Sequence, residues 1–123
     1  PQGSNFIQPI LNGCAILEHW TGASGHEGKS LFYVAGGRWK QVWATTRADL
    51  PGGMKEKTQV LEFPGPGVRF RGEILRQDGS TYLDRTTLTP LTDGRVRQLI
   101  EVSIDTGTNW QATFDAVYAP AGR

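Results

Sequence analysis

The sequence predicts a single all-β domain whose antiparallel strands close into a barrel. Glycine and proline cut its 123 residues into short runs of similar length, which is the pattern of barrels and sandwiches. Within several runs apolar and polar residues alternate, as they do in strands with one buried face. A chain of this length fits one domain that can bury its own core.

The expected strands follow from the turn signals. Asn12-Gly13, Asp78-Gly79 and Asp93-Gly94 tolerate the positive φ angles of tight hairpin turns. Further breaks are expected at residues 22–28, 36–37, 50–53, 64–67 and 105–109. The strands between these breaks are expected, in order, near residues 6–11, 14–20, 29–35, 38–45, 55–63, 68–76, 81–88, 95–104 and 110–118.

Alternation is clearest in residues 68–74, where the even positions are apolar or small and the odd positions are charged. Residues 110–118 follow the same period, with Val117 as the exception. Residues 95–104 are less regular, because Val96, Leu99 and Ile100 also fit the spacing of a helix. An α+β fold is the alternative for this segment, and the turn that follows it favours a strand.

That turn is Ser103-Ile-Asp105-Thr-Gly107-Thr-Asn109-Trp110. Asp105 can accept hydrogen bonds from turn amides, Gly107 can adopt an unusual φ, and Trp110 can cover the turn as the next strand begins. The segment resembles the Asp-box of sialidases, with Asn109 where threonine is usual. In that family the motif is structural and remote from catalysis, so the resemblance implies a hairpin and no glycosidase activity.

Charge and composition argue against several partners. Thirteen basic and twelve acidic residues give a net charge of +1, and the two signs are interleaved, so no basic stripe for nucleic acid is expected. No stretch approaches the roughly 20 apolar residues of a membrane helix, and no membrane partner is expected. No signal peptide is visible at the start of the chain.

The single cysteine, Cys14, excludes an internal disulfide and does not indicate an oxidising compartment, so a cytoplasmic location is favoured. We expect its side chain to be a small buried hydrophobe. His19 and His26 are the only histidines and lack ligand spacing, so neither a metal site nor a cofactor is expected. The fold is therefore expected to be stable without metal or disulfide.

A longer pattern covers most of the chain. Its clearest stretches are Gly13-Cys14-Ala15-Ile16-Leu17-Glu18-x-Trp20, Arg38-Trp39-x-Gln41-Val42-Trp43 and Val96-Arg97-Gln98-Leu99-x-Glu101. Together they resemble a bacterial family of unknown function with a calycin-like barrel, akin to lipocalins and nitrobindins. The resemblance implies an up-and-down calycin-like barrel of about nine strands and no particular activity. Members usually begin with a further Trp-containing strand, so we expect the barrel to be incomplete at its N-terminal edge.

Polar groups are expected among the aromatic residues of the barrel interior. Alternation carries Gln41 inward with Trp39 and Trp43, and it carries Glu18 inward with Trp20. Buried polar side chains of this kind are uncommon without a partner or a ligand. The inward face of residues 81–88 is ambiguous. The candidate ligand-binding residues are Glu18, Trp20, Trp39, Gln41, Trp43, Arg85, Gln98 and Tyr118.

The favoured function is binding of a small, partly apolar molecule inside the barrel, with no catalytic residue assigned. One alternative is an isomerase, cyclase or hydrolase that uses Glu18, Arg85 or Glu101 in the same cavity. The other is a structural or interaction module whose barrel is filled by side chains. A homodimer through the open edge near residues 6–11 is also expected, since this stretch is apolar and an unpaired edge recruits a second chain.

Overall fold

The computed structural model describes residues 3–45 and 54–121, and these form one antiparallel sheet of nine strands. Each strand pairs with its neighbours in the chain, so the topology is up-and-down, as predicted. In the described ranges no helix is long and apolar enough to cross a membrane. The strands are β1 (Ser4–Ile10), β2 (Ala15–Thr21), β3 (Glu27–Ala35), β4 (Arg38–Thr45), β5 (Met54–Gln59), β6 (Val68–Leu75), β7 (Thr81–Pro90), β8 (Val96–Ser103) and β9 (Gln111–Tyr118).

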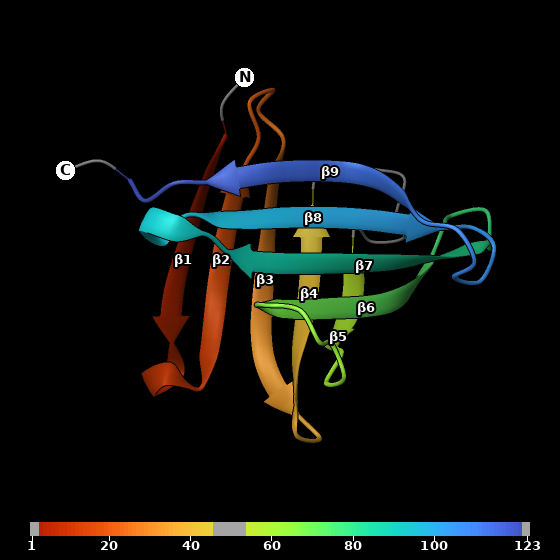
Figure 1. Ribbon diagram of the computed structural model, residues 1–123, viewed down its shortest axis with the longest axis horizontal. Coiled ribbons are helices and arrows are strands. Elements are labelled where there is room, and N and C mark those ends of the chain that lie inside the picture. Colours follow the sequence, from red (N-terminus) through yellow and green to blue (C-terminus); the bar gives the residue numbers. More distant parts are fainter. Residues whose placement is uncertain (1–2, 46–53, 122–123) are drawn as a thin grey trace.

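The sheet curls into an open half-barrel. Figure 1 shows β6–β9 crossing over β1–β5 at a steep angle, so that one face of the sheet is enclosed. Contacts across this concave face join the two halves: the Trp20 Nε1–H donates to Tyr118 Oη at 3.0 Å, and the rings of Phe32 and Phe70 lie 5.7 Å apart. Strands β1 and β9 are the two edges, and neither pairs with a further strand of the described chain. The expected incompleteness of the barrel is thus confirmed.

Each expected strand is present, with small differences at the ends. The segment after Arg95 is strand β8, so the helical alternative for it is wrong. β5 ends at Gln59 rather than at Phe63, because the chain turns there and the Phe63 N–H reaches back to the Val60 carbonyl at 3.5 Å. The turn expected at residues 50–53 lies outside the described residues.

Burial follows the predicted alternation in β6, where Phe70 and Ile74 are almost fully enclosed. Cys14, however, is exposed, and its prediction as a buried hydrophobe is wrong. It follows the 3-10 turn Leu11–Gly13 at the tip of the β1–β2 hairpin, outside the strand. Among the described residues the most buried apolar side chains are Ala15, Phe70 and Ile74, whereas the most buried polar ones are Glu18, Ser30, Gln41, Lys57, Asp84, Thr86, Thr87 and Ser103.

The turn between β8 and β9 has the contacts expected from its sequence. Asp105 Oδ1 accepts a hydrogen bond from the Asn109 backbone N–H at 2.9 Å, and Gly107 has a φ of 92°. The Trp110 Nε1–H donates to the Gly107 carbonyl at 3.1 Å, which holds the indole against the turn. Hydrogen bonds from the backbone and side chain of Asn109 and from Ser103 lower the pKa of Asp105 to about 2.

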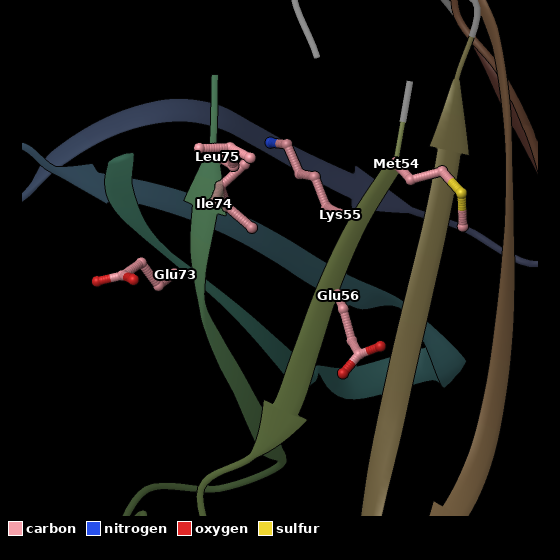
Figure 2. A pocket seen from close by; sticks show the side chains of 6 residues that line it. All are labelled: Met54, Lys55, Glu56, Glu73, Ile74 and Leu75. Atoms are coloured by element: carbon pink, nitrogen blue, oxygen red, sulfur yellow. The ribbon is translucent and has the colours of Figure 1, made fainter. Parts of the chain in front are cut away.

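The junction between the two halves of the sheet is short. β5 and β6 pair at Thr58 with Arg71 and at Gln59 with Phe70, and the Val60 N–H donates to the Arg69 carbonyl at 2.8 Å. At the other end of the two strands lies a groove of about 190 Å³, lined by Met54, Lys55, Glu56, Glu73, Ile74 and Leu75. Figure 2 shows Lys55 and Ile74 reaching from the two strands into this space.

Candidate functional site

The concave face holds a cavity of about 440 Å³. Its size falls in the range of small-molecule sites. It is bordered by strands from both halves of the sheet, so the curling of the sheet creates it. The lining residues are Glu18, Trp20, His26, Gln41, Trp43, Thr45, Lys55, Lys57, Arg76, Tyr82, Thr86, Gln98, Ile100, Val102, Thr113 and Phe114.

One wall of the cavity is aromatic. The Trp20 ring meets the Trp43 ring edge-to-face at 6.0 Å and the Phe114 ring at 6.1 Å. Gly28 stands opposite Trp20 in the β2–β3 register, and the Trp43 indole covers it so closely that a Cβ there would lie 2.1 Å from Trp43 Cη2. Because Gly28 has no side chain, strand β3 provides room for the Trp43 ring.

The floor of the cavity is a row of polar side chains across β2, β3 and β4. Glu18 stands opposite Ser30 in the β2–β3 register. The Gln41 Nε2–H donates to Ser30 Oγ at 2.8 Å, and the Asn5 Nδ2–H donates to Glu18 Oε2 at 2.8 Å. These bonds hold one end of each side chain. The other oxygens, Glu18 Oε1 and Gln41 Oε1, are buried and accept no hydrogen bond from any residue that the structure describes.

The floor continues into a charged cluster around Asp84, which is fully buried. Its carboxylate pairs with both Lys55 Nζ and Lys57 Nζ, each at 2.7 Å, and Lys57 also donates to Thr86 Oγ1 at 2.6 Å. Burial lowers the pKa of Lys57, and the Asp84 carboxylate only partly offsets this effect. For Lys55, burial also opposes the charged form, but Asp84 and Tyr82 outweigh it and raise the pKa.

A hydrogen-bonded chain closes the other side of the cavity. Tyr118 Oη accepts from Trp20 and donates to Gln98 Oε1 at 3.1 Å. Burial raises the pKa of the Tyr118 hydroxyl above its usual value of 10.0. Because Tyr118 belongs to edge strand β9 and Trp20 to β2, this chain fixes the indole across the opening of the half-barrel.

Five of the eight predicted site residues line the cavity, namely Glu18, Trp20, Gln41, Trp43 and Gln98. Tyr118 does not line the cavity but hydrogen-bonds to Trp20 and Gln98. Trp39 does not line the cavity, although it shares a face with Gln41 by alternation. It lies two residues closer to the β3–β4 turn, where its backbone N–H donates to Gln59 Oε1 at 3.1 Å.

Arg85 also lies away from the cavity. In β7 the even-numbered side chains Tyr82 and Thr86 face the cavity, so Arg85 projects from the convex face. There it pairs with Glu101 at 2.9 Å and stacks 4.0 Å from the centre of the Trp110 ring. Glu18 is therefore separated by the sheet from Arg85 and Glu101, the other two residues of the enzymatic alternative.

Sequence reasoning missed the charged cluster and His26. Lys55 and Lys57 alternate with Glu56 in a segment without apolar residues beyond Met54, which does not indicate a buried face. The available signal was the period of two, which places both lysines on one side of β5. Within residues 3–45 and 54–121, no three His, Cys, Asp or Glu side chains are grouped to hold a metal ion.

Comparison with protein-family models, with curated proteins and with solved structures finds no match for this chain. The fold and the cavity therefore define its class: an all-β protein with an up-and-down half-barrel and a mixed aromatic and polar cavity on its concave face.

Proposed function

We propose that the protein binds a small, partly apolar molecule in the cavity of its half-barrel and does not transform it. The observation that carries this proposal is the combination of an aromatic wall with two buried acceptor oxygens, Glu18 Oε1 and Gln41 Oε1, that have no partner in the described chain. A buried polar atom without a hydrogen bond costs about 1–3 kcal/mol. A ligand that fills the cavity and donates to these oxygens would remove that cost.

The two other readings of the sequence have less support. A filled module needs side chains that occupy the interior, whereas a volume of about 440 Å³ is open. The enzyme alternative uses Glu18, Arg85 or Glu101, and of these three only Glu18 lines the cavity, so it would act there without the other two. The up-and-down order and the concave cavity also support our proposal that the fold is calycin-like.

The test is a cavity-filling variant with a matched control on the same strand. Ile100→Trp places an indole in the cavity, whereas Leu99→Trp places it on the convex face. We expect Ile100→Trp to unfold at nearly the wild-type temperature, since the indole enters open space, and to lose binding of aromatic probes measured by calorimetry. Leu99→Trp should retain binding. Strong destabilisation by Ile100→Trp alone would show that the interior is already filled.

We also propose that two copies of the chain associate through strand β1. This strand is an edge of the sheet, and Phe6 and Ile7 on its two faces are 64% and 53% exposed. Unpaired strand edges with apolar side chains favour pairing with another chain. A two-fold arrangement in which β1 meets its own copy is the simplest way to cover the β1 edge of each chain.

Light scattering measures this association directly. A dimer has twice the chain mass of 13.5 kDa, and Phe6→Lys should return it to 13.5 kDa by placing a charge at the edge. Leu61→Lys is the control, because Leu61 is 54% exposed and lies in the turn after β5. A wild-type mass of 13.5 kDa at micromolar concentration would refute the dimer.

A further inference from the structure

The positively charged side chains that line the cavity interior already make polar or ring contacts. Lys55 and Lys57 both pair with Asp84 at 2.7 Å, and Lys57 donates a further bond to Thr86. Arg76 donates to Ser80 at 3.2 Å and stacks 4.6 Å from the centre of the Tyr82 ring. An anionic group on a ligand would have to compete with these contacts.

In contrast, two hydrogen-bond acceptors of the cavity lining, on Glu18 and Gln41, lack a partner among the residues that the structure describes. Glu18 is 5% exposed, and only its Oε2 has a donor, which is Asn5. Gln41 is also 5% exposed, and its amide is held through Nε2 on Ser30. Glu18 stands opposite Ser30 and Gln41 is bonded to Ser30, so both side chains lie beside Ser30 on the floor of the cavity. Carboxylate and amide oxygens accept hydrogen bonds, so Glu18 Oε1 and Gln41 Oε1 each lack a donor within the described chain.

One wall of the cavity beside Glu18 and Gln41 is apolar, and its central ring is held in place by contacts. Trp20 is held by its bond to Tyr118 and by edge-to-face contacts with Trp43 and Phe114. Ile100 and Val102 complete the lining from β8. Ring systems pack well against such walls, and walls fixed before binding lower the entropic cost of association.

We propose that the cavity selects a neutral ring compound that carries a hydroxyl or N–H donor, with the donor held by Glu18 and Gln41, and that it discriminates against organic acids. This inference rests on the proposed function and specifies its ligand class. A charge-assisted hydrogen bond is roughly twice as strong as a neutral one, so Glu18 supplies most of the selectivity. A carboxylate placed at the same point is repelled by it.

Three probes on one ring system test the inference by titration calorimetry at pH 7: 2-naphthol, 2-methoxynaphthalene and 2-naphthoate. They present a donor, the same ring without a donor, and an anion. We expect 2-naphthol to bind at least about tenfold more tightly than 2-methoxynaphthalene, in line with one hydrogen bond to a charged acceptor, and 2-naphthoate to bind most weakly.

Two substitutions test whether Glu18 causes this order of affinities. Glu18→Gln keeps an acceptor oxygen without the charge and should reduce the advantage of 2-naphthol to about threefold, while Glu18→Leu should abolish it. Glu73→Gln, an exposed carboxylate on the outer face of β6, removes the same charge and should leave the order unchanged. Circular dichroism melts establish that each variant is folded. If Glu18→Leu does not fold, Glu18→Gln alone tests whether Glu18 causes the tighter binding of 2-naphthol.

The possible outcomes distinguish failure of the donor site from failure of small-molecule binding itself. Equal affinity for 2-naphthol and 2-methoxynaphthalene would overturn the donor site and leave small-molecule binding intact. Tightest binding of 2-naphthoate would overturn it as well, and would assign the cavity to acids through Lys55 or Arg76. An advantage of 2-naphthol that persists in Glu18→Leu would show that the donor binds elsewhere. No binding of any probe would overturn both proposals.

Discussion

Asp84 is the residue whose removal should damage the fold most. It is fully buried, and it is the carboxylate that pairs with both Lys55 and Lys57 at 2.7 Å. The side chain of Lys57 is only 5% exposed, so water cannot replace the lost partner. Removing one member of a buried ion pair costs about 3–5 kcal/mol, because it leaves a charge without compensation. We expect Asp84→Ala to lower the free energy of unfolding by that amount.

Asp84→Asn separates charge from shape, since the amide fills the same space. Its deficit relative to wild type should shrink as the pH rises from 7 toward 10. The pKa of Lys57 is already lowered by burial, and without Asp84 it falls further. The unfolded chain then binds more protons than the folded one, so the stability of the variant increases with pH.

Urea denaturation at several pH values measures both effects. The control is Asp115→Ala, which breaks the bidentate pair with Arg97 on the surface and should leave the free energy of unfolding almost unchanged, because exposed pairs contribute little. A loss below about 1 kcal/mol for Asp84→Ala, or a deficit for Asp84→Asn that does not vary with pH, would refute the burial argument.

Three further outcomes are expected. Gly28→Ala should cost about 1–3 kcal/mol by overpacking and should shift tryptophan emission, since the new Cβ meets the Trp43 ring; an unchanged spectrum and melt would contradict the close contact. Tyr118→Phe should cost about 1 kcal/mol, because the Trp20 N–H loses its acceptor, and a chemical denaturation curve checks it. The folded-state pKa of Asp105, about 2, lies below its usual 3.8. Its stabilisation is therefore present above about pH 4 and lost as pH falls toward 2. Acid titration of Asp105→Asn should show a flatter loss over this interval, and an identical acid profile would count against the turn contacts.

The strand order could be predicted from the sequence because each strand pairs with its chain neighbour, so the information is local. The Gly and Asx-Gly turns mark where each strand ends, and alternation in β6 identifies Phe70 and Ile74 as buried. β8 was recognised from the turn after it, although its own residues also fit a helix.

The site was only partly predictable, because it depends on contacts between distant strands. Trp43 and Gln41 could be placed inward, because residues two apart in a strand share a face and the tryptophan is expected to be buried. In β7 both faces carry polar residues, so the sequence does not show that Asp84 faces inward and Arg85 outward. Lys57 is buried because Asp84, 27 positions further along the chain, compensates its charge. No local pattern in β5 indicates that partner.

The short pairing between β5 and β6 has a consequence for how the molecule opens. The other neighbouring strands are joined by five or more residue pairs, whereas β5 and β6 share two pairs and one further backbone bond from the Val60 N–H to the Arg69 carbonyl. The least protected point inside the sheet is therefore its centre and not only its edges. Segments with few backbone bonds open at low free energy, so amides that face the groove in Figure 2 should exchange with solvent faster than those of the β3–β4 or β7–β8 ladders. The two halves of the sheet, β1–β5 and β6–β9, can then open as two separate cooperative units.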